Sequence, residues 1–220
     1  MREVRAFFEK SGCCIYMSHL DLTRCVSRAV RRAGIPIWYT EGFNPHPFFT
    51  FALPLSLGQS SVCETMDFKV VEDISDDDIV SRFNACLPDG IKIISAAEPV
   101  MKHTAICWAR YEVRFYLEGQ SGREITEKIS ALMDSENIFV DKRTKSKQIK
   151  QFDFKECVKE YKVTGEPDCA CVEIILPAGC VNNVNPSLLE TPAQKALGTD
   201  LFVMAIKRTG VYTADMQNFK

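Results

Sequence analysis

Two short segments carry the densest set of side chains able to exchange protons or hold a ligand. The first is Ser18-His19-Leu20-Asp21, and the second is the run GFNPHP at residues 42–47. Because histidine titrates near neutral pH, His19 and His46 could pass protons to and from a substrate, or bind a divalent metal together with Asp21. We therefore take His19, Asp21 and His46 as candidate catalytic residues. The candidate ligand contacts around them are Ser18, Glu41, Gly42, Phe43, Asn44, Pro45 and Pro47.

Two alternatives stand beside catalysis: ligand contact without chemistry, and a structural role alone. Asp21 can serve only to cap a helix, His19 can hydrogen-bond to a backbone carbonyl, and His46 can brace its loop. The two prolines of the second segment restrict the backbone and hold His46 in few orientations. Since both segments belong to one βαβ unit of the expected fold, we predict that His19, Asp21, Asn44 and His46 converge in one pocket.

Short signatures of other enzyme classes are missing from the sequence. The nucleotide-binding patterns G-x-x-x-x-G-K-[ST] and G-x-G-x-x-G do not occur, nor do G-x-S-x-G and H-E-x-x-H. The ten cysteines include an adjacent pair, Cys13-Cys14, and a C-x-C, Cys169-Ala170-Cys171, but no C-x-x-C and no C-x-x-x-C-x-x-C. We expect free, mostly buried thiols, with Cys169 and Cys171 on the buried face of a strand, and no iron–sulfur cluster.

Two basic clusters point to nucleic acid. The outward face of the first predicted helix and the turn of a predicted hairpin could each hold phosphates, with nearby aromatic side chains stacking on bases. The alternative is that each cluster is an ordinary solvated face. The helix carries Arg24, Arg28, Arg31 and Arg32; the hairpin carries Lys142, Arg143, Lys145, Lys147 and Lys150; the aromatics are Trp38, Tyr39, Phe43, Phe48 and Phe49.

The elements that must position these residues follow from hydrophobic periodicity and capping signals. The order β-α-β-β-α-β occurs once before about residue 100 and again after it, with a first helix capped by Ser18. In the first half, strands are expected at 3–9, 35–42, 63–71 and 91–100, and a further strand or extended segment at 48–55. Ser75 caps a second helix. In the second half we expect hairpins at 137–154 and 158–179. The predicted fold is therefore α+β, with two tandem ferredoxin-like (βαββαβ) domains that have antiparallel sheets, at residues 1–103 and 104–220.

Composition bounds the function only loosely. Of the 220 residues, 46% are apolar and 25% charged, as in ordinary globular proteins. The net charge of −2 gives no general signal for nucleic acid, and no apolar run is long enough to span a membrane. The start MREVRAFFEK lacks the apolar stretch of a signal peptide, so we expect the cytoplasm.

The run from Ser18 to Glu64 resembles the radical SAM-linked protein family, a bacterial domain without an assigned activity. The matching blocks are Ser18–Asp21, Gly42–Pro47, Leu55–Glu64 and a closing R-T-G-x-Y at Arg208–Tyr212. The resemblance covers nearly the whole chain. Phe48 departs from it, because the family more often has a basic or polar residue there, and this weakens a phosphate role for the loop. The resemblance adds Glu64 to the candidate contacts.

The resemblance implies an accessory protein that binds RNA or presents substrate to a separate radical-SAM enzyme. SAM and the iron–sulfur cluster are expected only on that partner, so we expect no cofactor on this chain. Two alternatives from other classes remain. One is a histidine- or metal-dependent RNA-processing hydrolase built on His19, Asp21 and His46, and the other is a scaffold that grips another protein.

Overall fold

The structure, a computed structural model, describes residues 1–143 and 149–220, and it divides into two compact units. Unit 1 comprises Met1–Ile106 and Gln217–Lys220, and unit 2 comprises Cys107–Met216. The sequence placed the boundary at 103/104 and assigned the C-terminus to the second domain. The last residues belong to unit 1 because the Lys220 carbonyl accepts hydrogen bonds from the Arg5 guanidinium (2.7 Å) and from the Met101 amide (3.0 Å).

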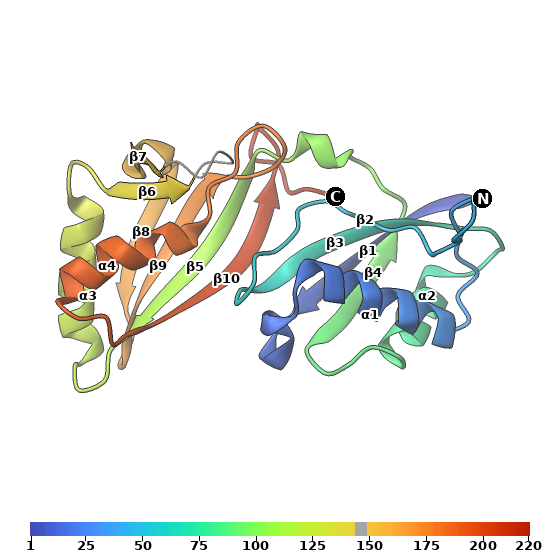
Figure 1. Cartoon of the computed structure of the whole chain (residues 1–220), viewed down its shortest axis with the longest axis horizontal. Coiled ribbons are helices and arrows are strands. Elements are labelled where there is room, and N and C mark those ends of the chain that lie inside the picture. The colour runs from blue at the N-terminus through green and yellow to red at the C-terminus, as the bar shows by residue number, and fades with distance from the viewer. Residues whose placement is uncertain (144–148) are drawn as a thin grey trace. The chain divides into compact units, whose positions relative to one another are not determined.

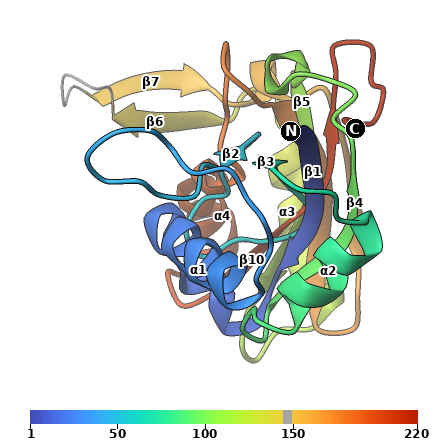
Figure 2. The ribbon, with the colours of Figure 1, turned by 90° about the vertical axis from the view of Figure 1, so that its right-hand side faces the viewer.

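Unit 1 has the ferredoxin-like order predicted from the sequence. Its strands run β4-β1-β3-β2, every neighbouring pair is antiparallel, and α1 and α2 cover one face of the sheet (Figures 1 and 2). A short 3-10 helix, η1, precedes α1, and another, η2, follows β4. The elements are β1 (Arg2–Lys10), η1 (Gly12–Tyr16), α1 (His19–Arg32), β2 (Thr50–Phe51), β3 (Ser60–Val70), α2 (Asp76–Asn84), β4 (Ile91–Ala97) and η2 (His103–Ala105).

Unit 2 repeats this order with one addition. Its sheet runs β10-β5-β9-β8, again antiparallel throughout, and the hairpin β6–β7 is inserted between α3 and β8 (Figure 1). The elements are β5 (Trp108–Tyr116), α3 (Gly122–Asp134), β6 (Phe139–Arg143), β7 (Ile149–Asp153), η3 (Lys155–Cys157), β8 (Glu160–Gly165), β9 (Cys169–Pro177), η4 (Pro186–Leu189), α4 (Glu190–Leu197) and β10 (Val203–Tyr212). The predicted fold class is thus confirmed.

The strand predicted at 35–42 is the main error in the secondary structure. In its place the structure has two isolated bridges, Ile37 with Val70 and Tyr39 with Pro47, and the strand or extended segment predicted at 48–55 contains only the short β2. The cause is the proline content of this segment, because proline has no amide hydrogen and interrupts a strand ladder. The segment between α1 and β2 is therefore a loop fastened to the sheet edge at a few points.

Sheet alternation determines which residues of unit 1 face the helices. Val4, Ala6 and Phe8 of β1 are buried in the core with α1 and α2. The residues between them, Glu3 and Arg5, point to the opposite face, which neither α1 nor α2 covers. On β3 the same rule directs Met66, Phe68 and Val70 toward the helices, and Asp67 and Lys69 away from them.

Candidate nucleic-acid interface

The start of α1 is a capped helix terminus in which Asp21 is held by its neighbours. The Ser18 hydroxyl accepts a hydrogen bond from the Asp21 amide at 3.2 Å and donates one to the Asp21 carboxylate at 2.6 Å. Arg24 donates to the same carboxylate at 3.3 Å. The Ser18 hydrogen bond, with a smaller contribution from Arg24, lowers the pKa of Asp21. Asp21 therefore stays ionised and accepts hydrogen bonds, which fits the capping alternative.

His19 lies on the exposed side of the helix start and contacts the ring of Phe51. The two ring centroids are 5.0 Å apart and the planes meet at 83°, an edge-to-face arrangement. Phe51 in turn packs edge-to-face on Phe8 of the core, with centroids 6.2 Å apart. His19 thus closes the outer end of an aromatic stack.

His46 braces the loop that follows α1. Its Nδ1 lies 3.0 Å from the Asn44 carbonyl oxygen and 3.1 Å from the Thr40 hydroxyl. Its backbone amide donates to that hydroxyl at 3.2 Å, and the Thr40 amide donates to the His46 carbonyl at 2.9 Å. Because a carbonyl only accepts, we assign a proton to Nδ1, which donates it to the Asn44 carbonyl. Gly42 has a φ of +122°, which favours glycine at the turn.

These residues form two groups, whereas the sequence predicted one shared pocket. The first group, His19 and Asp21, opens α1. The second, His46, belongs to the loop beyond the other end of that helix, where Arg31 contacts Tyr39. Twelve helical residues separate His19 from Arg31, a rise of about 18 Å at 1.5 Å per residue. No hydrogen bond or ring contact within unit 1 as described joins the two groups.

The basic face of α1 is exposed, as the sequence predicted. Leu22, Val26, Ala29 and Val30 form the buried face, and the four arginines lie on the other side. Arg24 pairs with Asp21, and Arg32 donates to the Cys86 carbonyl at 2.5 Å. Arg28 and Arg31 have no carboxylate partner among the described residues. Their charges are therefore available to an anionic ligand.

Aromatic side chains continue this basic face into the loop. The Arg31 guanidinium lies over the Tyr39 ring, 5.8 Å from its centroid, and Tyr39 bridges to Pro47. Phe43 is fully exposed. We call the combined area the α1–loop surface; it comprises Arg24, Arg28, Arg31, Tyr39, Phe43 and His46.

The remaining predicted contacts fall into three sets. Glu41, Gly42, Asn44 and Pro45 are exposed on the loop, whereas Pro47 is buried. Glu64 is buried in β3, with a 5% exposed side chain, so direct contact with a ligand would require rearrangement. In the hairpin cluster, Lys145 and Lys147 lie outside the described residues. For Lys142, Arg143 and Lys150 the structure describes the backbone, in β6 and β7, but not the side chains.

The predicted free thiols are confirmed, since all ten cysteines lie in the described residues and none forms a disulfide. The expectation that they are mostly buried is wrong, because only Cys14, Cys169 and Cys171 are buried. Cys169 and Cys171 are buried, but on the face of the second sheet opposite the helices. They pair in register with Tyr116 and Arg114, whereas Phe115 faces the core. That no iron–sulfur cluster assembles here stays a prediction.

Sequence reasoning missed a carboxylate–thiol cluster in the β8–β9 turn. Ligand atoms of Glu166, Asp168 and Cys169 lie within 4.8 Å of one another. However, Arg114 already binds Glu166 at 3.2 Å, and it also binds Glu112 at 2.6 Å. Burial raises the pKa of Cys169, which disfavours the thiolate that a metal would need. The arrangement therefore fits an ion-paired turn better than a metal centre.

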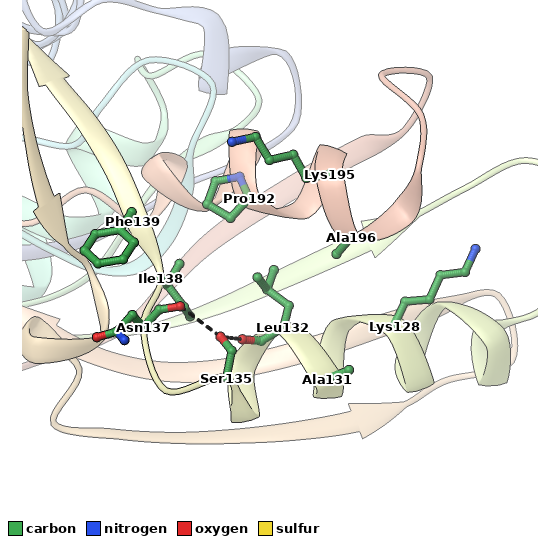
Figure 3. Close-up of a pocket in the computed structure, with 10 residues that line it drawn as sticks. All are labelled: Lys128, Ala131, Leu132, Ser135, Asn137, Ile138, Phe139, Pro192, Lys195 and Ala196. Carbon is green, nitrogen blue, oxygen red and sulfur yellow. Dashed lines mark hydrogen bonds between the residues drawn. The ribbon is translucent and has the colours of Figure 1, made fainter.

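The helix side of unit 2 has a groove of about 620 Å³ between α3, α4 and the start of β6 (Figure 3). Its lining is mostly apolar, with Leu132, Ile138 and Phe139, and Lys128 and Lys195 also line it. The Ser135 hydroxyl donates to the Leu132 carbonyl at 2.6 Å and so closes the end of α3. The groove holds no convergent set of catalytic groups.

A bacterial family profile described as "Uncharacterized protein conserved in bacteria (DUF2344)" matches residues 3–186. The chain belongs to this family. No curated protein matches it significantly. The described residues also contain no helix that is long and apolar enough to cross a membrane.

Two solved structures are similar to this member of the family at low identity. One is a chain of a Cbf5-Nop10-Gar1 complex, with 12% identity and a TM-score of 0.48, covering 94% of this chain and 48% of that chain. This chain thus spans about half the length of that relative. The other is an unknown protein from Galdieria sulphuraria, with 12% identity, a TM-score of 0.27 and coverage of 94% and 96%.

Proposed function

We propose that this protein is a cytosolic RNA-binding accessory protein, and that the α1–loop surface holds a single-stranded or looped segment of RNA. The observation that carries the proposal is the pair of outward arginines on α1, Arg28 and Arg31, which have no carboxylate partner in the described part of the chain and are followed by a loop with an exposed Phe43 ring. An exposed phenyl ring on a proline-braced loop offers an apolar face that a flat ligand can cover. Unstacked bases are such a ligand, because every base offers a flat face to an aromatic ring.

The charges on the same surface suit the RNA backbone. Arg28 and Arg31 follow each other along the outer face of α1, where guanidinium groups can each hold a phosphate oxygen. Tyr39, which the Arg31 guanidinium contacts, supplies a second ring on the same loop as Phe43. Phosphate contacts would thus come from the helix and stacking from the loop that follows it, the combination that single-strand binding uses.

The second half of the proposal concerns the partner. The resemblance to the radical SAM-linked family supports a role in presenting RNA to a separate radical-SAM enzyme, which would carry SAM and the iron–sulfur cluster. The basic hairpin at Lys142–Lys150 would extend the RNA contact in unit 2. Co-purification of the chain with such an enzyme, dependent on added RNA, is the expected result.

The proposal is tested by fluorescence anisotropy with a labelled single-stranded RNA of mixed sequence. Arg28→Glu should weaken binding and reduce its salt dependence, whereas Phe43→Ala should weaken binding equally at all salt concentrations, because stacking involves no counterions. Arg82→Glu is the matched control, since Arg82 is an exposed arginine on the other helix of unit 1. Absence of binding at low salt, or an equal loss in the Arg82 variant, would overturn the proposal.

A further inference from the structure

A second candidate site lies on the face of the unit 1 sheet opposite α1 and α2. It is a cavity of about 210 Å³, to which β1, β3, the segment around β2 and the 3-10 helix η2 all contribute. The sequence did not reveal this cavity, because its residues come from four segments that are far apart in the chain. Its lining consists of Glu3, Phe48, Thr50, Asp67, Phe68, Lys69 and His103.

One cross-strand ion pair lines this cavity, and the carboxylate of a second pair lines it as well. Glu3 stands opposite Lys69 in the β1–β3 register, and the Lys69 ammonium lies 3.1 Å from the Glu3 carboxylate. Arg5 stands opposite Asp67, and its Nε and Nη2 each donate to one carboxylate oxygen at 2.7 Å. Two cations and two anions balance each other. A lone phosphate or a metal ion would therefore meet as much repulsion as attraction, and a neutral polar ligand is favoured.

The C-terminus fixes one of these pairs in place. The Arg5 side chain is only 1% exposed; its Nη1 donates to the Lys220 carbonyl at 2.7 Å, and its guanidinium lies 4.3 Å from the centroid of the Phe219 ring. Asp67 is held by a buried cation that cannot turn away. The acceptor is thus positioned before any ligand arrives, which reduces the ordering cost of binding.

The walls of the cavity are suited to a flat ring. Phe48 is 45% exposed, and its ring meets Trp38 edge-to-face at 5.9 Å, which leaves a face open. The His103 imidazole, also exposed, makes no hydrogen bond to another side chain in the described residues. At about 210 Å³ the cavity is smaller than the roughly 300–1,000 Å³ that encloses a drug-sized ligand. It has room for one ring system.

We infer that this cavity receives a single unstacked nucleobase of the bound RNA. The ring would stack on Phe48 while its edge meets the Glu3–Lys69 pair. Guanine fits this pair best, because a carboxylate can accept from two neighbouring N–H groups of its Watson–Crick edge while the ammonium donates to the adjacent carbonyl. This inference rests on the proposed function. The cavity and the α1–loop surface are joined through the backbone, because the Phe48 amide donates to the Trp38 carbonyl at 3.4 Å and Tyr39, the residue after Trp38, belongs to the α1–loop surface.

The test uses the whole chain and the four nucleoside 5′-monophosphates, followed by amide chemical shifts in nuclear magnetic resonance. Guanosine 5′-monophosphate should bind most tightly and shift the amides of Thr50, Lys69 and His103. Phe48→Ala should weaken its binding about five- to a hundredfold, the range found for loss of one base stack. Lys69→Met should remove the preference among the four bases. Phe139→Ala, an exposed ring in unit 2, is the matched control and should change nothing.

The outcomes separate this inference from the proposed function. If RNA binds through Arg28 and Phe43 but no mononucleotide shifts the three amides, or if Phe48→Ala binds as tightly as the wild type, the base pocket is refuted and RNA binding stands. If the mononucleotides bind while RNA shows no salt-dependent binding, the proposed function fails and the pocket stands. Folding of the Phe48 variant is checked by its amide spectrum away from the cavity.

Discussion

Replacing Asp67 with alanine should destabilise unit 1 by about 3 kcal/mol, because it leaves the buried guanidinium of Arg5 without its carboxylate. Arg5 is 1% exposed and Asp67 accepts two of its N–H groups at 2.7 Å. Removing one partner of a buried ion pair costs about 3–5 kcal/mol. The lower end applies here, since the Lys220 carbonyl still accepts one hydrogen bond and the Phe219 ring still covers the cation.

The reverse replacement should cost less. Arg5→Met removes the buried charge and keeps an unbranched side chain, and Asp67, whose side chain is 25% exposed, can then be hydrated. We expect a loss of about 1 kcal/mol, and the double variant should lie close to Arg5→Met. Urea unfolding is followed by tryptophan fluorescence in a Trp108→Phe background, so that Trp38 reports unit 1 alone. The reasoning is refuted if Asp67→Ala costs no more than Arg5→Met.

In unit 2, Gly122→Ala should lower the free energy of unfolding by about 2–3 kcal/mol in urea, because its Cβ would overlap the Glu166 carbonyl oxygen. Glu166→Gln should reduce the free energy of unfolding at neutral pH but not in acid, because the hydrogen bond from Arg114 lowers the pKa of Glu166. The stability that the Glu166 carboxylate contributes is present above the ordinary glutamate pKa and is lost as the pH falls through the pKa of Glu166 in the folded protein. A urea series across pH measures this, and a pH-independent difference would contradict it. Cys169, buried and with a pKa raised by that burial, should react with iodoacetamide far more slowly than the exposed Cys13, as peptide mass mapping would show; equal rates would argue against the burial.

Most of the fold could be predicted because its helices and strands follow from local patterns of apolar residues and helix caps. The α1 boundaries follow from the Ser18 cap and the spacing of Leu22, Val26, Ala29 and Val30, all of which are buried. The alternation in β5 likewise gave its core face. Such signals need only neighbouring residues, and they repeat in both units, which is why the tandem ferredoxin-like order could be deduced.

The features that the sequence does not show depend on contacts between distant segments. Cys169 and Cys171 share a buried face of β9, as predicted, but β9 is buried on both faces, so the sequence does not tell which face meets the helices. From the sequence alone, an arginine in a strand such as Arg5 is expected to be solvent-exposed. In the structure the C-terminal residue Phe219 covers it.

The candidate site shows the same limit. The basic face of α1 and the exposed loop were visible in the sequence, because charge and proline content are local. The separation of His19 from His46 was not, since it depends on the direction of α1 relative to the following loop. The proposed base pocket was not predicted, because only the pairing register of β1 and β3 brings Glu3 next to Lys69 and Asp67.

The central claim, that the α1–loop surface binds RNA, is tested most directly by the salt dependence of binding to single-stranded RNA. Each phosphate contact contributes about 0.7 to the slope of log K against log salt concentration. Replacing Arg24, Arg28 and Arg31 together by glutamine should therefore reduce the slope by up to about 2 and weaken binding most at low salt. A variant that keeps the wild-type slope and affinity would contradict the account.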